Sequence, residues 1–295
     1  MWFLYIMIDI SVYFNRMSVC LSLDPLAAGP MLCPAVGETE NFVMIRADLH
    51  THTIASGHGS RATIDRMAKT ASELGLSVLG ISDHGPATPG AAGPSYFRNL
   101  CLAPARRFGV RLLYGVETNI LDGGELDLPS SILSHLDYVI ASMHCPPRSR
   151  IYEGIGDIEA FRKANTDDYI RAMAHPQVRI IGHPDNSQFP YCVHRLTDAA
   201  AGYGVALEVN EASLGPDGYH RVRGLDTEDN YRILIRLCKK KRIPLLLSSD
   251  SHGPGRIGRV DRALQLLCEE DFPGDLLVNE NPALLSLPVQ TGHSL

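Results

Sequence analysis

The sequence predicts an α/β fold in which seven short strands alternate with helices, one strand fewer than a standard eight-fold barrel. Apolar runs of strand length recur along the chain, and the stretches between them place apolar residues at the three-and-four spacing of helices. Strands that alternate with helices pair in parallel through right-handed crossovers. The chain has 295 residues, 45% hydrophobic and 20% charged, a composition that fits one large globular domain.

The expected strands are short apolar runs, and each helix lies between two of them. We expect strands at 42–49, 77–82, 111–117, 138–142, 178–181, 205–209 and 245–249. We expect helices at 64–74, 158–173, 226–240 and 260–267. The basic run from Lys239 to Arg242 suits the C-terminus of a helix, where positive charge is favourable.

The first forty residues differ from the rest of the chain. An apolar segment at 1–10 contains Asp9, lacks a basic start, and is shorter than the roughly 20 residues that span a bilayer. Prolines and glycines without a clear period follow it. We therefore predict that 1–43 is a poorly ordered extension or a misassigned start, with translation beginning near Met31 or Met44, and that 44–290 forms the barrel domain. A signal peptide is the alternative, although no cleavage pattern stands out.

Charge and cysteine usage limit the class of protein. The net charge of −6 and a pI near 6.0 provide no overall field for nucleic acid, so we expect no nucleic-acid partner without a local basic patch. The seven cysteines are scattered and form no Cys-x-x-Cys pair. That spacing suits neither a disulfide framework nor a zinc ribbon, and it predicts a reducing, cytoplasmic location without membrane association. The oligomeric state cannot be read from the sequence.

Residues that bind metals follow almost every expected strand. The candidate ligands are His50, His52, His58, His84, Glu117, His144, His183, Asp250 and His252. In an extended chain residues i and i+2 point the same way, so His50 can share an ion with His52, and Asp250 can converge with His252. The strand that ends Glu208-Val209-Asn210-Glu211 is the exception, because it has polar groups but no histidine.

This pattern predicts a metal centre at the carboxyl ends of the strands, where barrels place their sites. Each residue alone has an ordinary interpretation: His84 as a turn residue, His183 as a core histidine, Glu117 as an ion-pair partner. Independent core histidines would not all choose the same end of successive strands. Nine nitrogen and oxygen ligands suffice for two ions, or for three with bridging, and they favour zinc, manganese or iron over calcium or magnesium.

The motifs Asp48-Leu49-His50-Thr51-His52, Ser82-Asp83-His84-Gly85-Pro86, Gly115-Val116-Glu117, Met143-His144, Gly182-His183-Pro184 and Ser249-Asp250-Ser251-His252 resemble the PHP (polymerase and histidinol phosphatase) superfamily. The small stand-alone bacterial phosphatases are the most similar branch. The resemblance spans roughly residues 45–285 and implies a distorted seven-stranded (β/α)7 TIM-like barrel with a trinuclear zinc-type site. It assigns His50, His52, Glu117 and Asp250 to one ion. Glu117 would bridge to a second ion at His144 and His183, and a third would lie at His58, His84 and His252.

Such a site implies a metal-dependent phosphoesterase. Three divalent ions against two carboxylates leave about four positive charges, which select a small phosphorylated molecule. We expect a metal-held hydroxide to hydrolyse a phosphomonoester, without a covalent enzyme intermediate. Histidinol phosphate is one candidate substrate. An arginine in a loop at the rim of the barrel could bind the phosphate; the candidates are Arg61, Arg98, Arg148 and Arg223.

Three other functions remain open. A phosphodiesterase or exonuclease would use the same metals, but it would need a basic groove with stacking aromatics, and aromatics are only 7%. An amidohydrolase also begins with His-x-His, but no lysine follows a strand here to serve as a carboxylated bridge. A structural metal module is disfavoured because structural zinc sites are closed and usually rich in cysteine.

Overall fold

A computed structural model gives the structure of the chain. It describes residues 45–144, 158–186, 188–215, 218, 221–222 and 225–285. The predicted extension 1–43 lies outside these residues, so the predicted domain boundary is not tested. The expected first strand also falls partly outside them, at 42–44.

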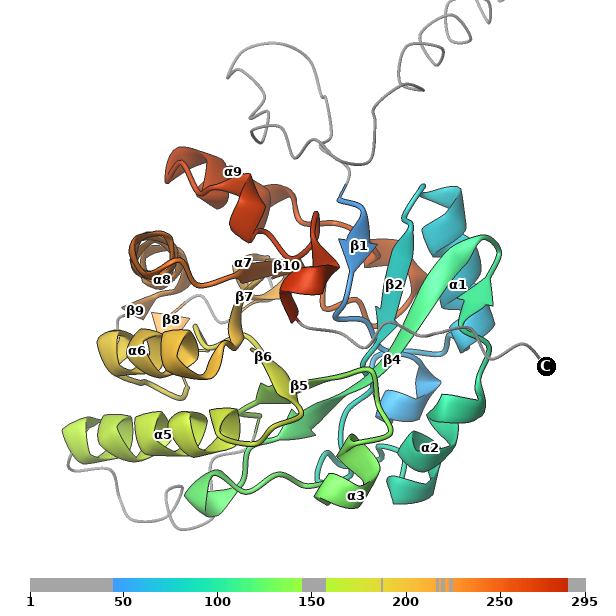
Figure 1. Cartoon of the computed structure of the whole chain (residues 1–295), viewed down its shortest axis with the longest axis horizontal. Coiled ribbons are helices and arrows are strands. Elements are labelled where there is room, and N and C mark those ends of the chain that lie inside the picture. Colours follow the sequence, from blue (N-terminus) through green and yellow to red (C-terminus); the bar gives the residue numbers. More distant parts are fainter. Residues whose placement is uncertain are drawn as a thin grey trace, which may run out of the picture.

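The core of the fold is a nearly closed barrel of parallel strands, which confirms the predicted (β/α)7 TIM-like architecture (Figure 1). Around the barrel the strands follow the order β1, β2, β4, β5, β6, β7, β10. Their bounds are β1 Ala47–Asp48, β2 Val78–Ile81, β4 Val110–Asn119, β5 Tyr138–Ser142, β6 Val178–Ile181, β7 Ala206–Asn210 and β10 Leu245–Ser248. Every adjacent pair along this order is parallel.

Strand β4 is longer than expected because it joins two parts of the barrel. Its first half pairs with β2 at 111–114 and its second half with β5 at 115–119. A short antiparallel strand, β3 (Arg106–Arg107), also pairs with its start. A second small sheet consists of β8 (Arg221–Val222) and β9 (Leu225–Asp226).

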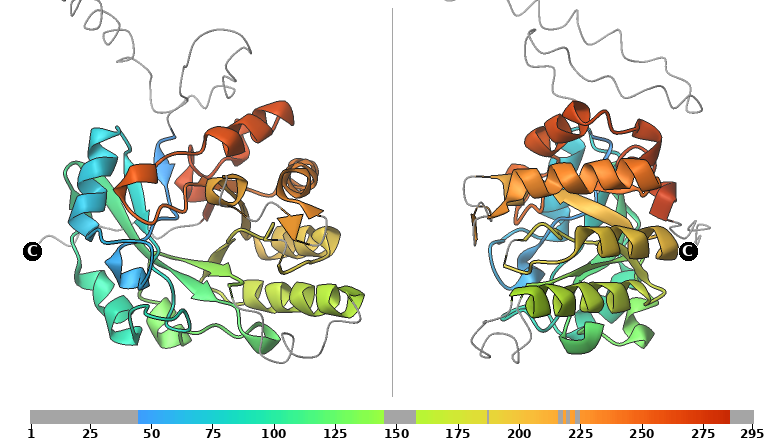
Figure 2. Two further views of the ribbon diagram at one scale, coloured as in Figure 1. Left: turned by 180° about the vertical axis from the view of Figure 1, so that it is seen from behind. Right: turned by 90° about the vertical axis from the view of Figure 1, so that its left-hand side faces the viewer.

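Helices cover the outside of the barrel. They are α1 Ile64–Glu73, α2 Pro94–Asn99, α3 Ser130–Leu133, α5 Ile158–Met173, α6 Val193–Tyr203, α7 Glu211–Leu214, α8 Thr227–Lys241 and α9 Asp261–Glu269. Short 3-10 helices lie at Ile54–Ser56, Leu100–Leu102, Asp122–Gly124, Pro254–Arg256, Gly274–Leu276 and Pro282–Leu285. Helices α5, α6, α8 and α9 follow one another along one side, and α1 lies on the other (Figures 1 and 2).

Helix α8 shows how local sequence sets an element. It begins after Asp226, whose carboxylate accepts a hydrogen bond from the Glu228 N–H, and it ends in the three lysines 239–241. Acidic residues at the start and basic residues at the end stabilise a helix, because they interact favourably with the partial charges of its dipole. Its buried face includes Tyr231, Leu234 and Ile235. Among the described helices, none has the length and apolar character needed to cross a bilayer.

The interior of the barrel is filled rather than open. An apolar cluster inside it includes Leu49, Leu113, Ile140, Ile180 and Leu246. The Tyr138 ring also lies there, and its hydroxyl donates to the Leu49 carbonyl over 2.6 Å. A Cβ at Gly80 would stand 2.2 Å from the Tyr138 hydroxyl, and one at Gly115 would stand 2.7 Å from the ring. Glycine at both positions therefore makes room for the tyrosine.

The barrel closes between β1 and β10 through side chains rather than a full ladder. Asn279, which is fully buried, donates to the Ala47 and Leu247 carbonyls and accepts from the Leu247 N–H, each over 2.8 Å. Towards the carboxyl end, Thr51 and Ser251 form a parallel bridge. The Asp48 carboxylate also accepts hydrogen bonds from the Ser249 hydroxyl and the Gly258 N–H. These contacts hold the first and last strands together directly below the predicted metal ligands.

Candidate metal centre

The nine predicted ligands come together at the carboxyl end of the barrel. The structure places His50 and His52 after β1, His58 after the 3-10 helix Ile54–Ser56, His84 after β2, Glu117 in β4, His144 after β5, His183 after β6, and Asp250 and His252 after β10. Two of them lie where the backbone turns out of a strand, His183 with φ 24° and Asp250 with φ 50°. Left-handed backbone at residues other than glycine is uncommon and concentrates at functional sites.

Glu117 occupies the centre of this group and is fully buried. Its Oε1 lies 2.8 Å from His183 Nε2, 3.0 Å from His144 Nε2 and 3.3 Å from His50 Nε2. Its Oε2 lies 2.6 Å from His84 Nδ1 and 3.6 Å from His52 Nε2. The two oxygens of one carboxylate thus face different histidines, which is the arrangement that a bridging ligand requires.

The remaining ligands form two neighbouring groups. On one side, Asp250 Oδ1 lies 3.0 Å from His52 Nε2 and 3.7 Å from His50 Nε2. On the other, the His58 ring lies 4.8 Å from the His84 ring and 5.1 Å from the His252 ring, centroid to centroid. His52 lies between the groups, because its ring centroid is also only 4.1 Å from that of His252.

The donor atoms fit a group of divalent ions. Several buried atoms that face the centre make no regular hydrogen bond with a described residue and approach only one another, at 2.6–3.7 Å: His50 Nε2, His52 Nε2, His84 Nδ1, Glu117 Oε2 and Asp250 Oδ1. Buried polar atoms normally form regular hydrogen bonds, so a cluster of imidazole nitrogens and carboxylate oxygens that meet without them requires an explanation. Three sets of ligand atoms lie within 4.8 Å of one another: His52, His84 and His252; His50, His52 and Asp250; and His84, Glu117 and His144. Imidazole nitrogens with carboxylate oxygens are the ligands of zinc, manganese and iron.

Residues behind the ligands orient the imidazoles. His50 Nδ1 lies 2.6 Å from Glu208 Oε1, and His144 Nδ1 lies 2.8 Å from Asn119 Oδ1. His52 Nδ1 lies 2.9 Å from the Ser56 hydroxyl, which itself donates to the Asp83 carboxylate. A partner that accepts the Nδ1 proton leaves the Nε2 lone pair facing the centre, as in metal sites generally.

Sequence reasoning missed Glu208 as part of the site, although its strand stood out for lacking a histidine. Glu208 is fully buried in β7, and its Oε2 accepts the His183 N–H over 2.6 Å. Asn210, two residues later on the same strand, donates to Asp250 Oδ2 over 3.1 Å. The alternation of polar residues at 208 and 210 was the available signal, because in a strand both point to the same face.

The charges around the centre favour ionised carboxylates. Burial raises the pKa of Glu117, but His144, His50 and His84 outweigh it, and the pKa lies well below its usual value. The pKa of Asp250 is likewise well below its usual value, because His50 and His52 outweigh its burial. Burial and the neighbouring His84 hold the pKa of His52 well below its usual value. Ionised carboxylates and a neutral imidazole are the forms that bind metals.

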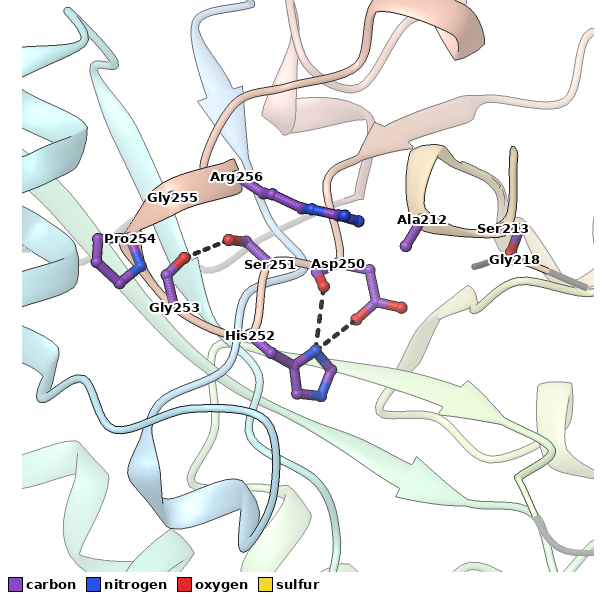
Figure 3. A pocket seen from close by; sticks show the side chains of 10 residues that line it. All are labelled: Ala212, Ser213, Gly218, Asp250, Ser251, His252, Gly253, Pro254, Gly255 and Arg256. Atoms are coloured by element: carbon purple, nitrogen blue, oxygen red, sulfur yellow. Dashed lines mark hydrogen bonds and ion pairs between the residues drawn. The ribbon is translucent and has the colours of Figure 1, made fainter. Parts of the chain in front are cut away.

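A pocket of about 510 Å³ opens beside Asp250 and His252 (Figure 3). Its other walls include α7 and the turn at 253–256, which carries Arg256. Of the arginines considered from the sequence, Arg61 and Arg98 are exposed and do not line this pocket, whereas Arg148 and Arg223 lie outside the described residues. Among the described residues the arginine in this wall is Arg256, which is also exposed and was not predicted from the sequence.

Comparison with known proteins agrees with the geometry. The PHP domain matches residues 48–212. A protein of Acetivibrio thermocellus described as "Probable phosphatase" is 39% identical over 235 residues, which cover 79% of this chain and 90% of that protein. Another "Probable phosphatase", from Clostridium novyi, is 37% identical over 233 residues, covering 79% and 89% of the two chains.

A solved structure shows the same fold. A protein of Listeria monocytogenes, described provisionally as a histidinol phosphatase, matches with a TM-score of 0.51 and 18% identity. The match covers 74% of this chain and 99% of that one. At this identity the structural similarity shows the barrel fold alone, whereas the sequence similarity to the two relatives covers 79% of the chain. The chain therefore belongs to the PHP domain family and is one of its phosphatases.

Proposed function

We propose that this phosphatase hydrolyses a small phosphomonoester with the help of divalent ions, in the first place zinc, held by the nine clustered residues. The observation that carries the proposal is the convergence of imidazole nitrogens and carboxylate oxygens on the buried Glu117, next to an open pocket. When bound, the ions would supply Lewis acidity that activates water and neutralises phosphoryl oxygens. A small phosphorylated molecule is the substrate that such a cationic site would select.

Contacts in the structure support a three-ion assignment. His50, His52, Glu117 and Asp250 would hold one ion, Glu117 with His144 and His183 a second, and His58, His84 and His252 a third. The close approach of Glu117 to both His144 and His183 supports the second group. The neighbouring rings of His58, His84 and His252 support the third.

The role of the protein's own side chains is to hold these ligands and to bind the substrate. Glu208, Asn119 and Ser56 fix the histidine rings so that a nitrogen faces the centre. Two serines line the pocket, Ser213 and Ser251. The Ser251 hydroxyl donates to the Gly253 carbonyl, and among the described residues no base lies within hydrogen-bonding distance of the Ser213 hydroxyl. Neither serine is therefore set up as a nucleophile, which supports direct attack by water.

The test is hydrolysis of a panel of phosphomonoesters, histidinol phosphate among them, with a phosphodiester as control. Dialysis against a chelator should abolish the activity, and zinc or manganese should restore it. His183→Ala should lower metal content and rate together, whereas His135→Ala, which changes an exposed histidine away from the centre, should alter neither. Full activity in protein shown to contain no metal, or a trapped phosphoryl-enzyme, would contradict the proposal. A clear preference for the diester would show that the substrate is a phosphodiester and not a phosphomonoester.

A further inference from the structure

Two polar groups in the pocket wall have no partner among the residues that the structure describes. The Arg256 side chain forms no ion pair or hydrogen bond with any described residue, although it lies in a wall that also contains Asp250. Ser213 is 2% exposed, and its hydroxyl also has no hydrogen-bond partner among the described residues. The Arg256 guanidinium is exposed at the pocket, and the Ser213 hydroxyl is buried in the wall behind it; together they favour a ligand group that does not belong to the metal centre.

The two groups come from different elements that face the same space. Ser213 belongs to α7, and Arg256 belongs to the 3-10 helix Pro254–Arg256 (Figure 3). In Figure 3 the Arg256 guanidinium extends from its turn towards the side of the pocket that carries Ala212 and Ser213. The ligands Asp250 and His252 line the same pocket. A molecule whose phosphate lies at the metal centre can therefore place its remaining atoms beside Arg256.

The turn that carries Arg256 is fixed at both ends. On one side the Ser251 carbonyl accepts the His52 N–H over 2.9 Å, and the Ser251 hydroxyl donates to the Gly253 carbonyl. On the other side Ile257 is buried, and the Gly258 N–H donates to the Asp48 carboxylate over 2.9 Å. Gly253 has φ 134°, which favours glycine, so the shape of the turn depends on its sequence. The base of the Arg256 side chain is thus held in a fixed position relative to the metal ligands.

The chemistry of this wall identifies the group that it would bind. A guanidinium presents several N–H donors in a planar fork that matches carboxylate and phosphate oxygens, and a hydroxyl can add one more donor. Other arginines nearby, such as Arg232 and Arg262, are already paired with Glu228 and Glu269. Within the described part of the chain the exposed Arg256 guanidinium has no acidic partner, so it can bind a ligand. The volume of about 510 Å³ lies within the range of small-molecule sites.

We infer that the substrate carries a second anionic group, a carboxylate or a second phosphate, which Arg256 binds with help from Ser213 while the reacting phosphate lies at the metal centre. This inference rests on the proposed phosphomonoesterase function and names its substrate class. Arg256 and Ser213 are then specificity residues, which hold the part of the substrate that does not react. Neutral phosphomonoesters should bind and react, but less well.

Binding of phosphonates, which cannot be hydrolysed, tests the inference separately from turnover. Calorimetry on the metal-loaded protein would compare propylphosphonate with 3-phosphonopropionate, which adds a carboxylate, and with propane-1,3-diyldiphosphonate, which adds a second phosphonate. The protein should bind at least one of the two doubly anionic ligands about ten-fold or more tightly than propylphosphonate, as expected for a charged hydrogen bond. The preferred ligand tells which anion is recognised.

Three variants locate the effect. Arg256→Gln should remove the preference and leave propylphosphonate affinity unchanged, and Ser213→Ala should reduce the preference by a few-fold. Arg259→Gln is the matched control, because Arg259 is an exposed arginine three residues later that does not line the pocket. Metal content should be equal in all variants. The ratio of kcat/KM for 3-phosphoglycerate and glycerol 3-phosphate should change in the same order.

The outcomes separate this inference from the proposed function. An equal loss for all three phosphonates in Arg256→Gln would mean that Arg256 holds the reacting phosphate, and it would overturn the inference. An unchanged preference in that variant, or no preference in the unaltered protein, would also overturn it, even if phosphomonoesters are hydrolysed. Absence of both phosphonate binding and phosphomonoester hydrolysis would instead refute the proposed function on which it rests.

Discussion

Replacing Glu208 with glutamine tests whether the residues behind the ligands control the metal centre. The fully buried Glu208 carboxylate accepts two short hydrogen bonds, from His50 Nδ1 and from the His183 N–H, each 2.6 Å long. Burial raises its pKa, but His50 and His183 outweigh that effect, so the pKa is lowered and both oxygens can accept. Glutamine keeps the shape but offers one acceptor oxygen, and its NH2 group would face an N–H donor.

The expected effect follows from these two bonds. Loss of a partner behind a ligating histidine typically lowers metal affinity 10–100-fold, or about 1.4–2.7 kcal/mol of binding free energy. Leaving one buried N–H without an acceptor should lower the free energy of unfolding by about 1–3 kcal/mol. We therefore expect Glu208→Gln to fold, but to release metal at a 10–100-fold lower concentration of competing chelator, with activity falling in parallel.

Glu211→Gln provides the matched control. Glu211 also accepts two N–H bonds, from Arg262 and Ala263 at the start of α9, but it contacts no predicted ligand in the described part of the chain. The same substitution there should lower stability and leave metal affinity unchanged. The assay is competition with a chromogenic zinc chelator, beside urea denaturation of both variants. Equal metal affinity in Glu208→Gln and the unaltered protein would refute the claim that Glu208 orients His50 for binding.

Further predictions concern the bridge, the closure of the barrel and the extension. Glu117→Gln should lose the bridged pair of ions and about two orders of magnitude or more of activity, whereas His252→Ala should lose mainly one ion. Measuring the metal content per chain and the hydrolysis rate of each variant checks both expectations. A full complement of metal in Glu117→Gln would show that the carboxylate is only structural. Asn279→Ala should lower the free energy of unfolding, measured by urea denaturation, by about 2–4 kcal/mol, because three buried backbone groups lose their partner. A change below about 0.5 kcal/mol would mean that other contacts hold β1 and β10 together. A chain that begins at Met44 should fold and keep its turnover, and loss of folded protein would show that residues 1–43 pack on the barrel.

The alternation of strands and helices could be predicted from the sequence because apolar periodicity is local. The expected helix at 158–173 matches α5, and the expected strand at 138–142 matches β5, residue for residue. The full length of β4 could not be predicted, because its pairing with β2 and then β5 is a property of the assembled sheet. The same holds for Asn279, which joins two strands more than thirty residues away in the chain and has no local pattern.

The candidate site shows the same division. Histidines and acids at successive strand ends could be recognised because their residue types and positions follow one rule. Glu208 and Asn210 obey that rule too, but without a histidine their role depends on contacts with His50, His183 and Asp250 that only the fold creates. A role for Arg256 could not be predicted for a similar reason. Nothing in its neighbourhood along the chain distinguishes it from Arg259, and only the position of the turn places it in the pocket wall.

The layers of the barrel interior separate stability from chemistry. Towards the amino ends of the strands lies the apolar layer with Leu113, Tyr138 and Leu246. Towards the carboxyl ends lie Glu117 and the imidazoles, with buried donor atoms that lack hydrogen-bond partners. Ions that bind these atoms in the folded chain contribute free energy of folding in proportion to the logarithm of ion concentration. Substitutions in the layer at the carboxyl ends should therefore act mainly on metal content and rate. Substitutions in the apolar layer, or of Asn279 between β1 and β10, should act mainly on the free energy of unfolding.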